Sequence, residues 1–424
     1  MRRGWLLCLG VVLASCSRGK QTQPSSPQRP VSPPLTIQWS APELIAPLPE
    51  VVDRVTRVSA AKAELPQVVW LEWSADPRQV PSSVMWSERE EAGWCKPRAL
   101  STQVQENLYP LLIIADATGE SVVAWLDKFP QDWMMCRRHQ GEWSAPGPLG
   151  VRGAAVTGHL LGKPGQFGFF YREFFWTRTF STLLTGSTRC RLLFRCLEAG
   201  QLGPPAIIAQ EGYFDATSAV GSTPNGDLVL AFFAKSARSR GGQGPSELYL
   251  SAMPAGKDGW AEPILLAAHP DADNPAILGF SVWAMDVWAE SASHVSVAYE
   301  LQHYTTGSIT SGRGDSDVYV ATWTKGGDAT VHMLRGWPVR PQPIVLGIPR
   351  LVGLPDGSLI LLYAAGSYLQ VAHWWNGEVL ATSQEQFPGT IRDIDLDAQG
   401  RLHVVGTSEE GLWYRRGTPG WIGH

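Results

Sequence analysis

A short phrase recurs along the chain. Trp-Ser-Ala-Pro stands at residues 39–42 and again at residues 143–146, and Trp-Ala-Glu-Pro stands at residues 260–263. Related or degenerate copies begin at Trp94, Leu202, near Val331, at Trp375 and at Trp421. A repeat of this length indicates units that cannot each bury a core alone and that stack on one another. The phrase therefore predicts a ring or array of about seven similar units.

Each unit contains a second recurring element upstream of the phrase, an apolar run, a turn and another apolar run. Examples are LLIIADATGESVVAWL at 111–126 and LVGLPDGSLILLYA at 351–364. Asp, Pro, Asn and Gly punctuate the turns, because they tolerate left-handed backbone or preset φ. We expect these segments to be turns and not calcium sites. The apolar flanks predict strands that are buried on both faces.

With a third strand and a second turn before the phrase, each unit has four strands. Such units are the blades of a β-propeller. We predict an all-β fold, a propeller of four-stranded antiparallel blades over residues 35–424, with seven blades and six or eight as alternatives. The Trp of the phrase is expected to fill the wedge between neighbouring blades. Residues 36–45, TIQWSAPELI, are expected to supply the last strand of the final blade and so remove a sheet edge.

The first residues form a targeting segment. Arg2 and Arg3 precede an apolar stretch, and small residues precede Cys16, which predicts a signal peptide over 1–15. The apolar stretch is too short to span a bilayer. LASC at 13–16 resembles the bacterial lipobox, and the resemblance implies that Cys16 is acylated and that Ser17 favours an outer membrane where the cell has one. The alternative is an ordinary secretory signal with a chance Cys.

Residues 16–34 are predicted to be the lipidated Cys and a tether. Residues 17–34 contain five Pro and no aromatic residue, so they cannot bury a core. In polyproline geometry they reach roughly 50 Å. We expect the propeller to be held off the bilayer, in the cell envelope outside the cytoplasm.

Charge and cysteine content exclude several classes of function. Charged residues make up 17% of the chain and the net charge is −4, so the basic stripe of a nucleic-acid binder is not expected. The sequence contains no CxxC pair, and no metal site or cofactor is predicted. Cys190 and Cys196 lie about 20 Å apart if their strand is extended, too far to bridge each other. Which of Cys95, Cys136, Cys190 and Cys196 otherwise pair, and whether they are free thiols, stays open.

The units resemble one known superfamily of propellers. A turn-rich hairpin, a strand such as SDVYVATW at 316–323 and the phrase Gly-x-Trp-Ser-x-Pro are similar to sialidase/BNR-type repeats over most of the chain. The Asp-box of that superfamily does not occur intact, so the resemblance implies the fold, and activity does not follow from it. A WD40 propeller is disfavoured because none of the 19 Trp is followed by Asp.

Three long connections in successive blades are candidates for a binding surface, because function concentrates on such loops. They span 172–188, 234–246 and 301–316. Their charged and aromatic residues are Arg172, Glu173, Phe174, Phe175, Trp176, Arg178, Arg238, Arg240, His303, Tyr304 and Arg313. Arginine forks and aromatic rings suit an anionic or carbohydrate-like ligand. The alternative is that these are solvated loops without a ligand.

A second group of polar residues is expected near the propeller axis, namely Asp215, Arg350, Arg392 and Asp393. The resemblance to sialidases implies three arginines on a substrate carboxylate, which Arg172, Arg350 and Arg392 would imitate. Glu173, Glu300 or Asp215 would then supply the carboxylates that glycoside hydrolysis requires.

We therefore predict an exported, lipid-anchored propeller that binds a ligand or a protein partner through long loops on one face. No catalytic motif is found, so a binding role is favoured over an enzyme. The alternatives are a sialidase-like glycoside hydrolase and an envelope assembly platform. The expected partners are the lipid bilayer, through Cys16, and a carbohydrate or an envelope protein, with no nucleic acid.

Overall fold

A computed structural model describes most of the chain beyond its first residues. The described ranges are 29–47, 56–60, 65–72, 82–104, 111–128, 132–151, 156–161, 163–174, 190–212, 214–235, 246–257, 259–268, 277–305, 315–334 and 347–422. Residues Ser32–His424 form one compact unit, separate from residues 1–31. The predictions for the signal peptide and for Cys16 lie outside the described residues. Within those residues, no helix has the length and apolar character needed to cross a bilayer.

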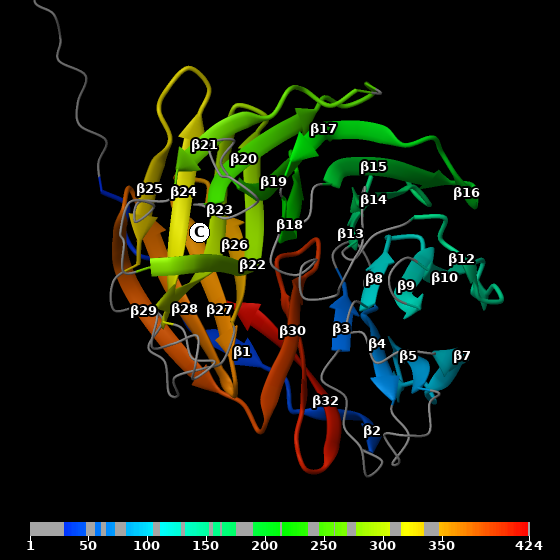
Figure 1. The fold of residues 1–424 in the computed structure, drawn as a ribbon. Coiled ribbons are helices and arrows are strands. Elements are labelled where there is room, and N and C mark those ends of the chain that lie inside the picture. The colour runs from blue at the N-terminus through cyan, green and yellow to red at the C-terminus, as the bar shows by residue number, and fades with distance from the viewer. Residues whose placement is uncertain are drawn as a thin grey trace, which may run out of the picture. The chain divides into compact units, whose positions relative to one another are not determined.

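The compact unit is a seven-bladed β-propeller, as predicted (Figure 1). Blade I contains β3 (Thr56–Ser59), β4 (Gln67–Glu72), β5 (Ser82–Glu90), β6 (Gly93–Trp94) and β7 (Arg98–Val104). Blade II contains β8 (Leu111–Ala115), β9 (Ser121–Lys128), β10 (Asp132–His139), β11 (Glu142–Trp143) and β12 (Gly147–Pro148). Blade III contains β13 (Val156–Leu160), β14 (Phe167–Phe174), β15 (Cys190–Glu198), β16 (Gln201–Leu202) and β17 (Ala206–Gly212).

The remaining four blades complete the ring. Blade IV contains β18 (Phe214–Ser222), β19 (Leu228–Lys235), β20 (Ser246–Met253) and β21 (Ile264–Ala268). Blade V contains β22 (Ile277–Ser291), β23 (His294–Thr305), β24 (Asp315–Thr324) and β25 (Thr330–Met333). Blade VI contains β26 (Ile348–Gly353), β27 (Leu359–Ala365), β28 (Tyr368–Trp375) and β29 (Glu378–Gln386). Blade VII contains β30 (Thr390–Leu396), β31 (Leu402–Thr407), β32 (Gly411–Pro419), β1 (Ile37–Trp39) and β2 (Glu43–Pro47).

The innermost strand of each blade is the first strand in its hydrogen-bonded order, and in blade VII this strand is β30. These inner strands contact one another in the closed order β3, β8, β13, β18, β22, β26, β30 and back to β3. All the pairings within the blades are antiparallel. The ends of the blades therefore form two faces. The loop face carries the connections from second to third strands and between blades, and the turn face carries the tight hairpin turns.

The N-terminal segment closes the ring, as predicted. In β1, Ile37 lies opposite Pro419 and Trp39 lies opposite Gly417 of β32, and β2 pairs with the same strand from Glu43 to Pro47. Blade VII is thus built from both ends of the compact unit. Because β1 supplies the outer strand, β32 does not present a free edge there.

The predicted turns are tight hairpins on the turn face. Asp116 Oδ1 accepts hydrogen bonds from the backbone N–H of Thr118 (2.8 Å) and Glu120 (3.1 Å), and Gly119 has a φ of 83°. Asp397 Oδ1 accepts from the N–H of Gln399 and of Arg401 in the same way, at 2.9 Å each. The aspartates of DATG and DAQG therefore shape the turns.

The repeated phrase has one structural role in five blades. After Trp39, Trp94, Trp143, Leu202 and Trp260, the next residue donates its backbone N–H to a carbonyl of the third strand at 2.7–2.9 Å. The Ser of the phrase adds a second contact, since Ser144 Oγ accepts from Arg137 N and Ser40 Oγ accepts from Arg416 N, both at 3.1 Å. The phrase is therefore a hydrogen-bonded entry into the outer strand.

The Trp residues of the phrase fill the wedges between blades, as predicted. The Trp143 ring lies 5.4 Å from that of Trp86 in blade I, and Trp94 lies 5.0 Å from Tyr414 in blade VII. Trp260 contacts Phe170 of blade III at 5.4 Å. These edge-to-face contacts join each blade to the one before it.

Two predicted copies of the phrase are wrong. Trp375 ends β28, and a two-residue turn at Asn376 and Gly377 leads directly into β29, so Trp375 belongs to the third strand. Trp421 follows β32, where β1 already occupies the outer position. Both errors arise because Trp also occupies other positions of a blade, here the end of the third strand at Trp375 and the segment after it at Trp421.

The four described cysteines are free thiols. Cys95 takes the place of the Ser in the repeated phrase, and its Sγ accepts from Glu88 N at 3.3 Å. Burial raises the pKa of the Cys136 thiol to about 11, so it stays protonated at neutral pH.

Candidate functional site

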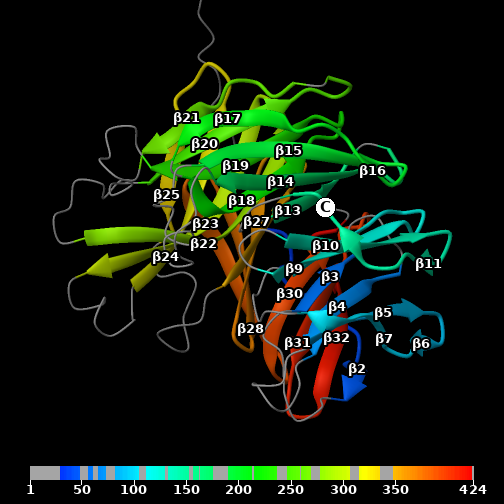
Figure 2. The same cartoon turned by 45° about the vertical axis from the view of Figure 1, so that its right-hand side comes forward.

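Blade V extends past the rim of the loop face. The buried Glu300 in β23 accepts a hydrogen bond from the backbone N–H of Gly347 (2.8 Å), which lies just before the first strand of blade VI. Beyond Glu300, β23 continues through Thr305, still paired with β22 as far as Ile277. Five strand residues span roughly 16 Å. The strands of blade V thus form a projection, visible in Figure 2.

The structure corrects where the long connections begin. Arg172 and Glu173 lie in β14, and His303 and Tyr304 lie in β23, because strand pairing continues to Phe174 and to Thr305. Asp215 lies in β18. The side chains of Asp215, His303 and Tyr304 are outside the described part of the structure. Other predicted residues of the connections lie outside the described ranges, namely Phe175, Trp176, Arg178, Arg238, Arg240 and Arg313.

Blade III presents an ion pair on the same face. Glu173 lies directly opposite Arg191 of β15, and their side chains form a salt bridge. The Glu173 and Arg191 side chains are 34% and 37% exposed, so both are partly accessible to solvent on this face. Arg191 is not among the residues predicted for the site. Its signal would have been its place at the start of the third strand, opposite the end of the second.

Arg172 and Glu300 join blades. Arg172 is 3% exposed, and its Nη1 donates to the carbonyl of Phe214 in blade IV at 2.7 Å. Glu300 also accepts from the Tyr363 hydroxyl of blade VI at 3.0 Å. Each residue therefore fixes the start of the next blade, which sets the geometry of the loop face.

A second group of charges lies between the inner strands of blades V to VII. Arg350 of β26 donates Nε to the carbonyl of Ile394 (3.0 Å) and pairs through Nη2 with Asp393 Oδ1 (3.3 Å). Asp393 Oδ2 accepts from Val58 N at 3.1 Å, and Asp395 Oδ2 accepts from Ala60 N at 2.6 Å.

These contacts have a structural cause. Neighbouring blades share no backbone ladder between their inner strands, so side chains must satisfy the facing backbone groups. Asp286 Oδ2 accepts from Leu351 N at 2.7 Å, Ser59 Oγ accepts from Ala115 N at 3.0 Å, and Thr217 Oγ1 donates to the Val282 carbonyl at 2.8 Å. The axial polar residues thus tie one blade to the next.

Two of the axial carboxylates have raised pKa values. Burial raises the pKa of Asp395 to about 6, and burial also raises the pKa of Asp286 above its ordinary value. Burial acts to lower the pKa of Arg350, but the attraction of Asp286, Asp393 and Asp395 outweighs it and the pKa is raised. A carboxyl with a raised pKa beside a second carboxyl and an arginine can take part in acid–base chemistry.

Replacing Asp395 by Asn is expected to stabilise the protein at neutral pH. Because the pKa of Asp395 is about 6 in the folded state and about 3.9 in the unfolded chain, ionisation costs stability as the pH rises through this window. Asn still accepts the Ala60 N–H and carries no charge. We expect D395N to gain about 1–3 kcal/mol over the parent at pH 7.5 and little at pH 4, measured by urea unfolding.

Asp397 is the matched control on the same chain segment. Burial acts to raise its pKa, but the hydrogen bonds from His403 (3.1 Å) and Arg401 (2.5 Å) outweigh it and lower the pKa. Its ionised form therefore stabilises the fold above the unfolded pKa, and D397N should lose stability at pH 7.5. A loss of stability in D395N as well would contradict the assignment.

The three arginines that the sialidase resemblance implies are bonded to different partners. Arg172 contacts blade IV, Arg350 contacts blade VII, and Arg392 donates Nε to Thr407 Oγ1 of its own blade at 2.9 Å. Their grouping around one substrate carboxylate stays a prediction. Across the described ranges, no group of three His, Cys, Asp or Glu is placed to hold a metal ion.

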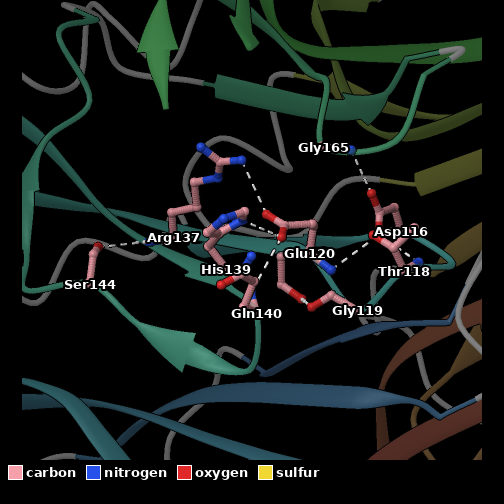
Figure 3. A network of polar contacts seen from close by, with 10 residues as sticks. Asp116, Thr118, Gly119, Glu120, Arg137, His139, Gln140, Ser144 and Gly165 are labelled. Atoms are coloured by element: carbon pink, nitrogen blue, oxygen red, sulfur yellow. Dashed lines mark hydrogen bonds and ion pairs between the residues drawn. The ribbon is translucent and has the colours of Figure 1, made fainter. Parts of the chain in front are cut away.

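The turn face carries a polar network between blades II and III (Figure 3). Glu120 accepts from Arg137 Nη2 at 3.1 Å and lies 2.5 Å from His139 Nδ1, while Asp116 Oδ2 accepts from Gly165 N of blade III at 2.6 Å. Glu120 thus joins the two hairpins of blade II, and the hydrogen bond from Gly165 to Asp116 links blade II to blade III.

Neither a protein-family model nor a curated protein sequence matches the chain. Solved structures do match it. The polysaccharide lyase Uly1 superposes with a TM-score of 0.58 and 9% identity, over 88% of this chain and 90% of the lyase. This likeness confirms the propeller fold.

Two other similar structures have lower scores. An ulvan lyase of a new polysaccharide lyase family has a TM-score of 0.45 and 14% identity, over 73% of this chain and 80% of that one. The α-L-arabinofuranosidase Arb93A from Fusarium graminearum has a TM-score of 0.45 and 9% identity, over 89% and 97%.

Proposed function

We propose that this chain is an exported, lipid-anchored propeller that binds an anionic carbohydrate on its loop face. The observation that carries the proposal is the projection of blade V beyond the rim. It carries His303 and Tyr304, with Asp315 directly opposite His303 in the strand register. The projection forms one side of a binding surface, and blade III contributes the partly exposed Glu173 and Arg191.

The chemistry of these residues suits a sugar acid or a sulfated sugar. Arginine forms bidentate hydrogen bonds with carboxylate or sulfate, and Glu173 accepts from sugar hydroxyls. Tyrosine offers a flat apolar face with a polar tip. The similar fold of a polysaccharide lyase over most of its length supports a carbohydrate as the ligand class.

The point at which the N-terminal segment joins the compact unit also supports the loop face as the binding surface. β1 enters the ring beside Pro419 at the end of β32, and Ser32 contacts His373 near the end of β28, so the N-terminal segment joins the compact unit on the turn face. With Cys16 acylated, the loop face would carry no attachment to the bilayer. An extended glycan could then reach it without steric hindrance from the membrane.

A second candidate function is glycan cleavage, and the axial carboxylates favour it. The pKa of Asp395 is raised to about 6, while Asp393 is paired with Arg350. Two carboxyl groups in unequal environments are the usual requirement for glycoside hydrolysis. The sialidase-like alternative of the sequence analysis is one form of this candidate.

A glycan array that reads retention and product release together tests both functions. We expect residues 29–424 to retain acidic glycans without release, and R191A to weaken retention about tenfold or more, as hot-spot arginines do. R138A is the matched control, because Arg138 pairs with Glu88 toward the turn face. Release that D395N abolishes would establish the enzyme instead. Neither retention nor release would overturn both and point to a protein partner.

A further inference from the structure

A linear hydrogen-bond relay of four side chains lies on the turn face of blade VI and consists of Asp356, Ser358, His373 and Ser32. Ser358 donates its hydroxyl to Asp356 Oδ1 at 2.6 Å. His373 Nε2 lies 2.8 Å from Ser358 Oγ, and His373 Nδ1 lies 3.0 Å from Ser32 Oγ. The relay joins the end of the tether, a hairpin turn and the third strand of the blade.

The donors and acceptors of the relay have one consistent order. Because the Ser358 proton is given to Asp356, Ser358 Oγ accepts from His373 Nε2–H. Nδ1 of the neutral ring then carries a lone pair, and it faces the Ser32 hydroxyl. Burial lowers the pKa of His373, which keeps the ring neutral at pH 7.

Exposure along the relay increases toward Ser32. Ser358 and His373 are fully buried, whereas Ser32 is only partly buried. A reagent from solvent therefore meets the Ser32 hydroxyl first. A hydroxyl on a neutral imidazole, whose other nitrogen is oriented by a third group, is the arrangement of an activated nucleophile.

We infer that Ser32 is an activated nucleophile that accepts acyl groups from carboxylic esters. In the transfer, Ser32 Oγ forms a bond to the ester carbonyl carbon and His373 Nδ1 takes the hydroxyl proton. The bond from that carbon to the alkoxy oxygen breaks, and the departing oxygen takes the proton from His373. The products are an ester of Ser32 and a free alcohol, so atoms and charge balance.

Ser40 and Ser383 provide matched comparisons. The Ser40 hydroxyl lies in the same N-terminal segment, but its Oγ accepts from Arg416 N and lies 3.1 Å from the Ala41 carbonyl, with no imidazole in either contact. Ser383 Oγ donates to the Leu35 carbonyl at 3.0 Å and so holds the segment without entering the relay. A reagent that reacts by exposure alone would not favour Ser32 over Ser40.

Labelling with an alkyl fluorophosphonate, read by peptide mass spectrometry on the full chain, tests the inference. We expect Ser32 to be modified roughly 100-fold faster than Ser40, the scale of general-base assistance. H373Q should remove that advantage and S358A should reduce it. S383A, which loses a contact of the segment outside the relay, should reduce it less than H373Q does. Equal labelling of Ser32 and Ser40, or a rate unaffected by H373Q in a protein that still melts cooperatively, would overturn the inference. Failure to bind glycans would leave this result unaffected.

Discussion

Removal of residues 29–47 is expected to abolish the cooperative folding of the propeller. These residues supply β1 and β2, and both pair with β32 of blade VII. They also bury Leu35 and Ile37 in the cluster between blades VI and VII. Losing two buried aliphatic side chains and a strand pairing costs on the order of 5 kcal/mol or more. That is comparable with the whole stability of a typical domain, about 5–15 kcal/mol.

The measurement is thermal unfolding followed by circular dichroism, comparing residues 17–424 with residues 48–424. A synthetic peptide of residues 29–47 should restore the transition, because it can pair with β32 as the natural segment does. The control chain begins at residue 29 and keeps every described contact of the ring. A melting temperature of 48–424 within a few degrees of the parent would show that β32 does not need an outer partner.

The number of blades and the closure of the ring were predictable because the blades pack against their neighbours through similar residues at the same position. The Trp of the repeated phrase stands at one position in four blades, and Leu202 takes it in a fifth. The same hydrogen bond follows it each time, so similar residues recur at a regular interval. The copy at Trp375 misled the prediction, because Trp375 ends the third strand and a two-residue turn leads directly into the outer strand.

The site was less predictable, because its contacts join residues that are distant in sequence and have no repeat. Arg350 and Asp393 lie on neighbouring inner strands, 43 residues apart. Arg191 becomes visible only when the register of β14 and β15 places it opposite Glu173. In the sequence, charged residues near the axis resemble ligand-binding residues. In the structure, several of them form hydrogen bonds with backbone groups of the next blade.

Removing an aromatic ring from a wedge between two blades is expected to have the second large effect on stability. The Trp143→Ala variant is expected to lose about 3–5 kcal/mol of unfolding free energy, the usual cost of deleting a buried aromatic ring. Trp143 is 9% exposed and packs against Trp86, over which Arg138 also lies at 5.1 Å. Among the described residues, the Trp143 indole N–H has no hydrogen-bond partner, so its contribution is one of packing.

The Trp143→Leu variant distinguishes apolar volume from the aromatic contact, because Leu202 fills the same position of blade III. If volume is what the wedge requires, this variant should recover about half of the loss in urea unfolding. Ile264→Ala is the surface control, since Ile264 is 40% exposed in an outer strand and should change stability by less than about 0.5 kcal/mol. If Leu proves as costly as Ala at position 143, the aromatic contact itself holds blade II to blade I. Blade III would then depend at Leu202 on other contacts, of which the Arg195 bond to the Gly150 carbonyl (2.7 Å) is one.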